Sequence, residues 1–212
     1  MIELKKTDDG LSFAVKVQNL TGHKLPTAYP SRRAWLHITV KDNSGRTVFE
    51  SGALNPDGSI TGNDNDADPS KFEPHHSEIT SPDQVEIFEP ILGDMNGHVT
   101  TGLLSAVRYL KDNRILPSGF DKTTAQPNIA VVGAAHDDPG FTGGAAQIRY
   151  AIRAAEAGPY QVKAELWYQP IGFRWAHNLE PYKAAEPQRF VSYYKADSNK
   201  SAIILAEAEG KF

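Results

Sequence analysis

The feature that most constrains the fold is a series of short runs in which apolar and polar residues alternate. The clearest runs are residues 11–18, 35–41, 146–152 and 160–169. A period of two is typical of a β-strand with one buried face. Turn clusters separate the runs, and the chain holds 17 glycines and 14 prolines. The pattern predicts a mainly β fold, an antiparallel β-sandwich of immunoglobulin-like or jelly-roll-like type with two short helical insertions and long loops.

Length and charge narrow the class of protein. The chain has 212 residues, which suits one domain, so we expect residues 1–212 to form a single sandwich. The net charge is -4 and no basic tract occurs, which argues against a nucleic-acid partner. No apolar run is long enough for a membrane span. The first residues lack the apolar segment of a signal peptide, and a strand-like pattern directly after Met1 suggests a piece trimmed from a longer protein.

The chain contains no cysteine. Disulfides, thiolate metal sites, a cysteine nucleophile and covalently attached c-type haem are therefore excluded within it. Cysteine usage leaves the cellular compartment open.

Local patterns assign the remaining elements. Residues 34–50 predict a hairpin, and the runs at 146–152 and 160–169 predict a longer hairpin at the centre of a sheet. Residues 84–90 predict a strand and 202–206 a final short strand. Two helices are expected, the first an insertion at about residues 100–114 and the second at 181–195. The first helix would bury an apolar stripe of Leu103, Leu104, Val107, Tyr109 and Leu110.

The segment at residues 19–35 joins two predicted strands and is unusually constrained. Gly22 permits unusual backbone angles, whereas Pro26 and Pro30 fix theirs. We expect a stiff, extended surface loop, which suits recognition because little entropy is lost on binding. An alternative is a structured corner that only caps the sandwich. The candidate partner-contact residues are His23, Lys24, Tyr29, Arg32 and Arg33.

A long loop at about residues 51–82 is rich in acidic side chains. Asp64, Asp66 and Asp68 are spaced by two residues, and oxygen ligands in such a series suit Ca²⁺. The pattern is not an EF-hand, because the required glycine and distant glutamate are missing. The sequence thus predicts a calcium site here, with a solvated acidic loop as the alternative.

Evidence for catalysis is weak. His75 with Glu73 or a distant histidine suggests a zinc or copper site, but no third ligand can be placed. Hydrolase, metalloprotease and P-loop motifs are absent. The aromatic residues between 167 and 182 fit a carbohydrate-stacking face, or more ordinarily a core or interface. We therefore expect that the chain is not an enzyme.

Several motifs, taken in order, resemble a known kind of domain. They are residues 21–27 (TGHKLPT), 29–36 (YPSRRAWL), 48–52 (VFESG), 62–68 (GNDNDAD), 72–75 (FEPH), 83–89 (DQVEIFE), 109–120 (YLKDNRILPSGF) and 141–144 (FTGG). Over residues 4–206 the chain resembles the haem-free C-terminal β-domain of bacterial multihaem c-type cytochromes. Each motif is weak alone, whereas their order is specific.

The resemblance implies a role in extracytoplasmic electron transfer, in the bacterial periplasm or outside the cell. Haem would lie only in a neighbouring domain or subunit. His23 would approach that haem as a ligand or a propionate partner, and Lys24, Arg32 and Arg33 would pair with propionates. The leading hypothesis is a non-catalytic accessory domain that contacts a haem-bearing partner. The alternative is a calcium-stabilised extracellular module that binds a glycan or another cell-envelope ligand.

Overall fold

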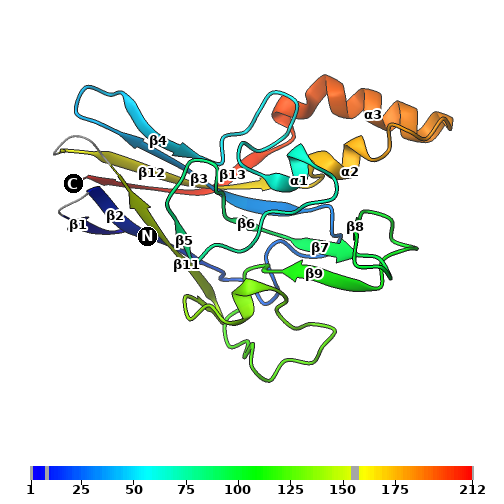
Figure 1. Cartoon of the computed structure of the whole chain (residues 1–212), viewed down its shortest axis with the longest axis horizontal. Coiled ribbons are helices and arrows are strands. Elements are labelled where there is room, and N and C mark those ends of the chain that lie inside the picture. Colours follow the sequence, from blue (N-terminus) through cyan, green and yellow to red (C-terminus); the bar gives the residue numbers. More distant parts are fainter. Residues whose placement is uncertain (1, 8–9, 154–157, 212) are drawn as a thin grey trace.

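The computed structural model describes residues 2–7, 10–153 and 158–211. Within these ranges, two five-stranded sheets and a three-stranded sheet carry the extended structure. Figure 1 shows the small sheet at the right-hand end of the view and the longest helix above it. The fold is mainly β with antiparallel sheets, as the alternating runs predict.

The first sheet has the order β1-β2-β11-β10, with β5 paired to β11. All its pairs are antiparallel except that of β5 with β11. Its strands are β1 (Ile2–Thr7), β2 (Gly10–Gln18), β5 (Glu78–Ile79), β10 (Phe141–Thr142) and β11 (Ala145–Ile152).

The second sheet has the order β13-β12-β3-β4, with β6 paired to β3. The predicted hairpin at residues 34–50 is confirmed, because β3 and β4 pair antiparallel within this sheet. The last strand is longer than predicted. The strands are β3 (Arg33–Lys41), β4 (Thr47–Ser51), β6 (Ile87–Phe88), β12 (Gln161–Gln169) and β13 (Ile203–Lys211).

The two large sheets share one apolar core. Burial alternates along β2, where Phe13 and Val15 are buried, and Phe13 stacks on Tyr150 of β11 with ring centroids 4.9 Å apart. Ile38 of β3 and Val162 of β12 belong to the same buried cluster. Each fully buried large apolar side chain contributes about 1.5–3 kcal/mol. The alternating pattern therefore becomes a sandwich because both sheets hide one face against the other.

The central strand β3 is also covered on its outer face. Trp35 is fully buried there with Ile60, Val85 and Ile87. Its indole nitrogen donates to the backbone oxygen of Gly52 at 2.8 Å. A side chain at Gly52 would collide with the backbone of β3, so the chain following β4 lies tightly against Trp35. This second layer brings the acidic loop over the second sheet.

The expected helix at about residues 100–114 is wrong. The structure has β7 (Pro90–Gly93), β8 (Val99–Thr100) and β9 (Arg108–Asp112), which form the small antiparallel sheet in the order β8-β7-β9. Sheet pairing supplies long-range hydrogen bonds that helical periodicity alone cannot reveal. The apolar residues expected on one buried helix face are consequently divided, and Leu103, Leu104 and Val107 are exposed in the β8–β9 connection.

The expected long hairpin of residues 146–152 and 160–169 is also wrong. These runs form β11 and β12, which lie in different sheets. Ile148 and Val162 instead belong to the same buried apolar cluster. Alternation identifies a strand with one buried face, but it does not identify the neighbour that completes the hydrogen bonds.

Helical structure is limited in the described residues. The helices are α1 (Asp64–Ala67), α2 (Phe173–His177) and α3 (Ala185–Asp197), with 3₁₀ turns η1 (Ala134–His136) and η2 (Ser198–Lys200). The predicted helix near residues 181–195 is confirmed as α3, which buries Val191 and Tyr194. Across the described residues, none of these helices combines the length and apolarity that crossing a membrane requires.

Candidate functional site

The segment between β2 and β3 joins the two large sheets and is held by its own side chains. Asn19 is buried, and its amide nitrogen donates to the backbone oxygens of His23 at 2.7 Å and Ile115 at 3.0 Å. Its amide oxygen accepts from the backbone and hydroxyl of Thr21. Leu25 forms an antiparallel bridge with Ile115. These bonds tie the segment to Ile115, far along the chain.

His23 is exposed at the turn of this segment. Its Nδ1 lies 3.0 Å from the backbone oxygen of Lys24. Leu20, three residues earlier, is 90% exposed. A histidine beside an unburied leucine is available to a macromolecular partner.

Lys24 is anchored rather than free. Its ammonium group lies 2.7 Å from the buried carboxylate of Asp112 and donates to the oxygen of Ala130 at 3.2 Å. Burial lowers the pKa of Lys24 below its ordinary value, although the Asp112 carboxylate opposes the shift. Arg114 shares the same carboxylate at 2.8 Å. Lys24 thus fixes the loop to β9, and a haem propionate would have to compete with Asp112 for it.

Tyr29 contacts α2, whereas Arg32 bonds within its own segment. The ring of Tyr29 is half exposed and meets Trp175 edge-on with centroids 5.5 Å apart. Arg32 is partly buried and donates to the oxygen of Thr27 at 3.1 Å. Of the predicted contact residues, His23 and Tyr29 are the exposed ones.

Arg33 is not on the surface, which corrects the expectation that the loop presents it. Only 3% of the residue is exposed. Its guanidinium pairs with Asp66 at 2.8 Å and donates to Gln169 at 2.7 Å and the oxygen of Gly58 at 3.1 Å. Burial alone would lower the pKa of Arg33, but the Asp66 carboxylate outweighs it and raises the pKa. This arginine is a structural cross-link between β3, β12 and the acidic loop.

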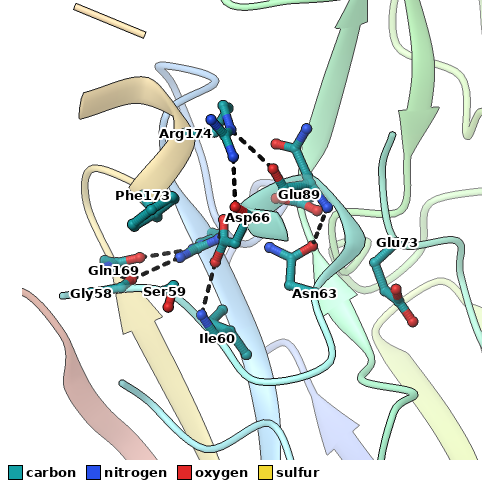
Figure 2. A network of polar contacts seen from close by, with 12 residues as sticks. Gly58, Ser59, Ile60, Asn63, Asp66, Glu73, Glu89, Gln169, Phe173 and Arg174 are labelled. Carbon is teal, nitrogen blue, oxygen red and sulfur yellow. Dashed lines mark hydrogen bonds and ion pairs between the residues drawn. The ribbon is translucent and has the colours of Figure 1, made fainter. Parts of the chain in front are cut away.

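Figure 2 shows Asp66, Gln169 and Gly58 converging in this network, with Arg174 of α2 above them. The second oxygen of Asp66 accepts from the backbone nitrogen of Ile60 at 2.8 Å. Arg174 donates to the backbone oxygens of Asn65 and Asp66. Both carboxylate oxygens of Asp66 are consequently engaged by the protein.

The structure does not bring the three predicted calcium ligands together. Asp66 points inward to Arg33, whereas Asp68 accepts from the backbone and hydroxyl of Ser70 at 2.9 and 2.7 Å. Asp64 is exposed. Among the residues that the structure describes, no group of three or more His, Asp or Glu side chains is arranged to hold a metal ion.

His75 lies in a second buried polar cluster instead of a metal site. Its ring nitrogens contact Glu86 at 2.6 Å and Asp138 at 2.9 Å, and its side chain is 1% exposed. Burial opposes the charged ring, but Glu86 and Asp138 together raise the pKa of His75. Asn113 donates to Glu86 at 2.8 Å. Since both ring nitrogens are engaged and enclosed, this histidine has no open position for a substrate.

Sequence reasoning missed a third buried charge pair. Lys111 of β9 is almost wholly buried, and its ammonium lies 3.3 Å from Glu89. Burial raises the pKa of Glu89, although Lys111 and Arg33 oppose the shift. Glu89 ends a predicted strand, while Lys111 lies in a predicted helix, so no local pattern connects them.

An exposed apolar surface lies on the small sheet. Leu103, Leu104 and Val107 in the β8–β9 connection and Met95 in the β7–β8 turn are all exposed; we call these four residues the hairpin patch. Val107 donates to the oxygen of Gly93, so the two connections lie side by side. From the hairpin patch, β9 runs to Asp112, which holds Lys24. Clustered exposed apolar residues are typical of interaction surfaces.

Comparison with known proteins adds one finding. No family model matches the sequence, and no curated protein matches it. The structure is similar to that of a penta-heme cytochrome c552 from Thermochromatium tepidum, with a TM-score of 0.55 and 18% sequence identity. The alignment covers 100% of this chain and 38% of that cytochrome. At this identity the likeness shows the fold alone, and it links that fold to a multihaem cytochrome.

Proposed function

We propose that this chain is a non-catalytic interaction domain that docks with the haem-bearing domain or subunit of a multihaem c-type cytochrome. The observation that carries the proposal is the structural match, which covers the whole chain but only 38% of a penta-heme cytochrome. Because this fold occupies only part of such a protein, we expect it to lie next to segments that bind haem. The chain itself has no cysteine and cannot attach haem through thioethers.

The exposed end of the molecule supports this role. The hairpin patch presents apolar side chains, and Leu20 and His23 lie on the loop that Lys24 fixes to the same small sheet. Large apolar side chains gain free energy when a partner buries them, and an ordered surface loses little conformational entropy on docking. We propose a haem-bearing domain as the occupant of this surface, in the periplasm or at the cell surface.

The environments of the ionisable side chains support a non-catalytic role. His75 is enclosed between two carboxylates, and Arg33 and Lys111 are used in buried ion pairs. A general acid or base needs a position from which it can reach a substrate. The calcium-stabilised alternative has less support, because Asp66 is committed to Arg33 and Ile60.

The test begins with the coding sequence just upstream. If an in-frame series of Cys-x-x-Cys-His motifs lies upstream, that haem-binding region is produced as a separate fragment and used as the partner. If a neighbouring gene encodes a cytochrome, that cytochrome is used as the partner subunit. Binding of the purified chain to that cytochrome is then measured by biolayer interferometry. We expect saturable binding, and a cytochrome that neither binds the chain nor is continuous with it would contradict the proposal.

Variants of the hairpin patch sharpen this test. Replacing Leu103 and Leu104 by Glu puts charge into the proposed contact and should weaken binding by more than about tenfold. Tyr193→Glu adds charge at an exposed position of α3 and is the matched control, with unchanged binding expected. Equal affinities for both variants would place the contact elsewhere.

A further inference from the structure

His23 differs from the other histidines of the chain. The sequence has seven histidines, and in the described ranges each of the others is paired with a carboxylate. The pairs are His37–Glu165, His75–Glu86, His76–Glu73, His98–Asp94, His136–Asp137 and His177–Glu180. Within those same ranges His23 has no carboxylate partner, and its ring is exposed. Among the residues that the structure describes, its imidazole is thus the one left without a carboxylate partner.

The hydrogen bond at Nδ1 assigns the tautomer of this ring. Nδ1 lies 3.0 Å from the backbone oxygen of Lys24, which can only accept, and 3.3 Å from the hydroxyl of Thr21, whose proton is donated to the amide oxygen of Asn19. Nδ1 must therefore carry the proton, which leaves the lone pair of the neutral ring on Nε2. Metal-ligating histidines typically donate their other ring N–H to a carbonyl or carboxylate in this way.

The backbone beneath the ring is fixed before any partner binds. The oxygen of His23 accepts from the amide of Asn19 at 2.7 Å. Asn19 also reaches Ile115, and the side chain of Lys24 is bound to Asp112. Binding at Nε2 would consequently cost little conformational entropy.

A single imidazole cannot hold a free metal ion, and no second ligand set lies among the described residues. A metal ion that His23 ligates must therefore be held mainly by ligands from another molecule and keep one coordination position open. A haem iron with an open axial position meets this requirement. Leu20, three residues before His23, is exposed and offers an apolar side chain to a porphyrin edge.

We propose that Nε2 of His23 is offered in trans as an axial ligand to a haem iron that the partner carries. This inference rests on the proposed function, because the haem belongs to the partner. The new bond is a dative bond from Nε2 to iron, which displaces a bound water and changes no oxidation state. The structure thereby favours the ligand role of His23 over pairing with a propionate.

A haem peptide with one histidine ligand and water in the other axial position is the probe. The N-acetylated ferric peptide is titrated with the purified chain and followed by the Soret band. The wild-type chain should convert the iron to a low-spin, bis-histidine spectrum. His23→Ala should reduce the affinity by more than about tenfold. His98→Ala is the control, since His98 is exposed but pairs with Asp94, and it should behave as wild type.

The outcomes separate cleanly. No spectral change with the wild-type chain, or an equal change with His23→Ala, would overturn the proposal. If His23→Ala melts at a lower temperature, His23→Gln replaces it, because an amide keeps bulk and polarity without an imidazole.

Nitrogen NMR of the wild-type chain gives a second readout that needs no haem. At a pH where the ring is neutral, the His23 signals should show a protonated Nδ1 and a bare Nε2. The opposite tautomer would contradict the geometric argument. Loss of cytochrome binding in a chain that still ligates the haem peptide would count against the docking proposal alone. Docking without ligation would count against this inference alone.

Discussion

Two buried regions of this molecule are stabilised in opposite ways. Between the large sheets, side chains such as Leu36, Ile38 and Ile148 pack in a buried apolar cluster. On the outer side of the second sheet, Arg33 and Asp66 are as well buried but depend on each other. The apolar core tolerates apolar side chains of similar volume, whereas the ionic layer requires particular atoms at particular distances.

This difference explains what each region does. The core makes the sandwich stable, and the ionic layer ties loops of irregular structure to it. Arg33 joins β3 to the acidic loop, Lys24 joins the β2–β3 segment to β9, and Lys111 joins β9 to Glu89. The loops outside the two large sheets have few strand hydrogen bonds, so these buried ion pairs hold them in place.

The largest expected effect is removal of Arg33. Arg33→Met keeps the apolar volume but leaves the Asp66 carboxylate and the Gln169 amide without their partner. Breaking a buried pair on one side costs about 3–5 kcal/mol. Denaturant unfolding should show this loss of stability.

The double variant Arg33→Met with Asp66→Asn is the matched control. It removes the stranded charge, while the remaining amide oxygen can still accept from Ile60. It should recover part of the lost stability. A double variant that is less stable than Arg33→Met would show that the pair is not the source of the effect.

The second effect depends on pH. Because its folded pKa is raised, His75 stabilises the fold fully below its ordinary value of 6.5, and this contribution is lost as pH rises through the folded pKa. The stability difference between wild type and His75→Gln should therefore be largest below pH 6.5 and shrink as the pH rises through the raised folded pKa of His75.

Thermal melts of both proteins across this range measure the change. A constant difference between wild type and His75→Gln would mean that the ring does not change charge between its two carboxylates.

A smaller effect is expected in the apolar core. Ile148→Val removes one methylene group from a fully buried position and should cost about 0.5–1.5 kcal/mol by chemical denaturation. The contrast with Arg33→Met is the direct measure of the two kinds of packing. A core variant as damaging as Arg33→Met would remove that contrast.

The smallest effect concerns calcium. Since Asp66 is committed to Arg33 and Asp68 to Ser70, added calcium or a chelator should leave the melting midpoint unchanged. A midpoint that rises with calcium and falls with chelator would show that the acidic loop rearranges around an ion. In that case the calcium-stabilised alternative would gain support.

The same contrast sets the limit of sequence reasoning. Alternation located β2, β3, β11 and β12 because each buries one face in the core. It could not identify strand partners, so β11 and β12 were wrongly paired. It also failed at residues 100–114, where an apolar spacing that fits a helix belongs to an exposed connection and a strand.

The buried charges were beyond a local pattern. Asp66 lies 33 positions from Arg33, and Asp138 lies 63 positions from His75. Partners at such separations leave no trace in a single sequence, because each charge alone looks like a surface residue. The expectation that the loop presents Arg33 at the surface is corrected for this reason, because its side chain is buried against Asp66.

The segment that carries His23 leaves one large sheet and enters the other, and it is bonded to Ile115 on the way. Such a bridge cannot swing like a tether. A molecule bound to this segment would be held at a fixed distance and angle from both sheets. The sandwich would thereby set the spacing between that molecule and the rest of an assembly.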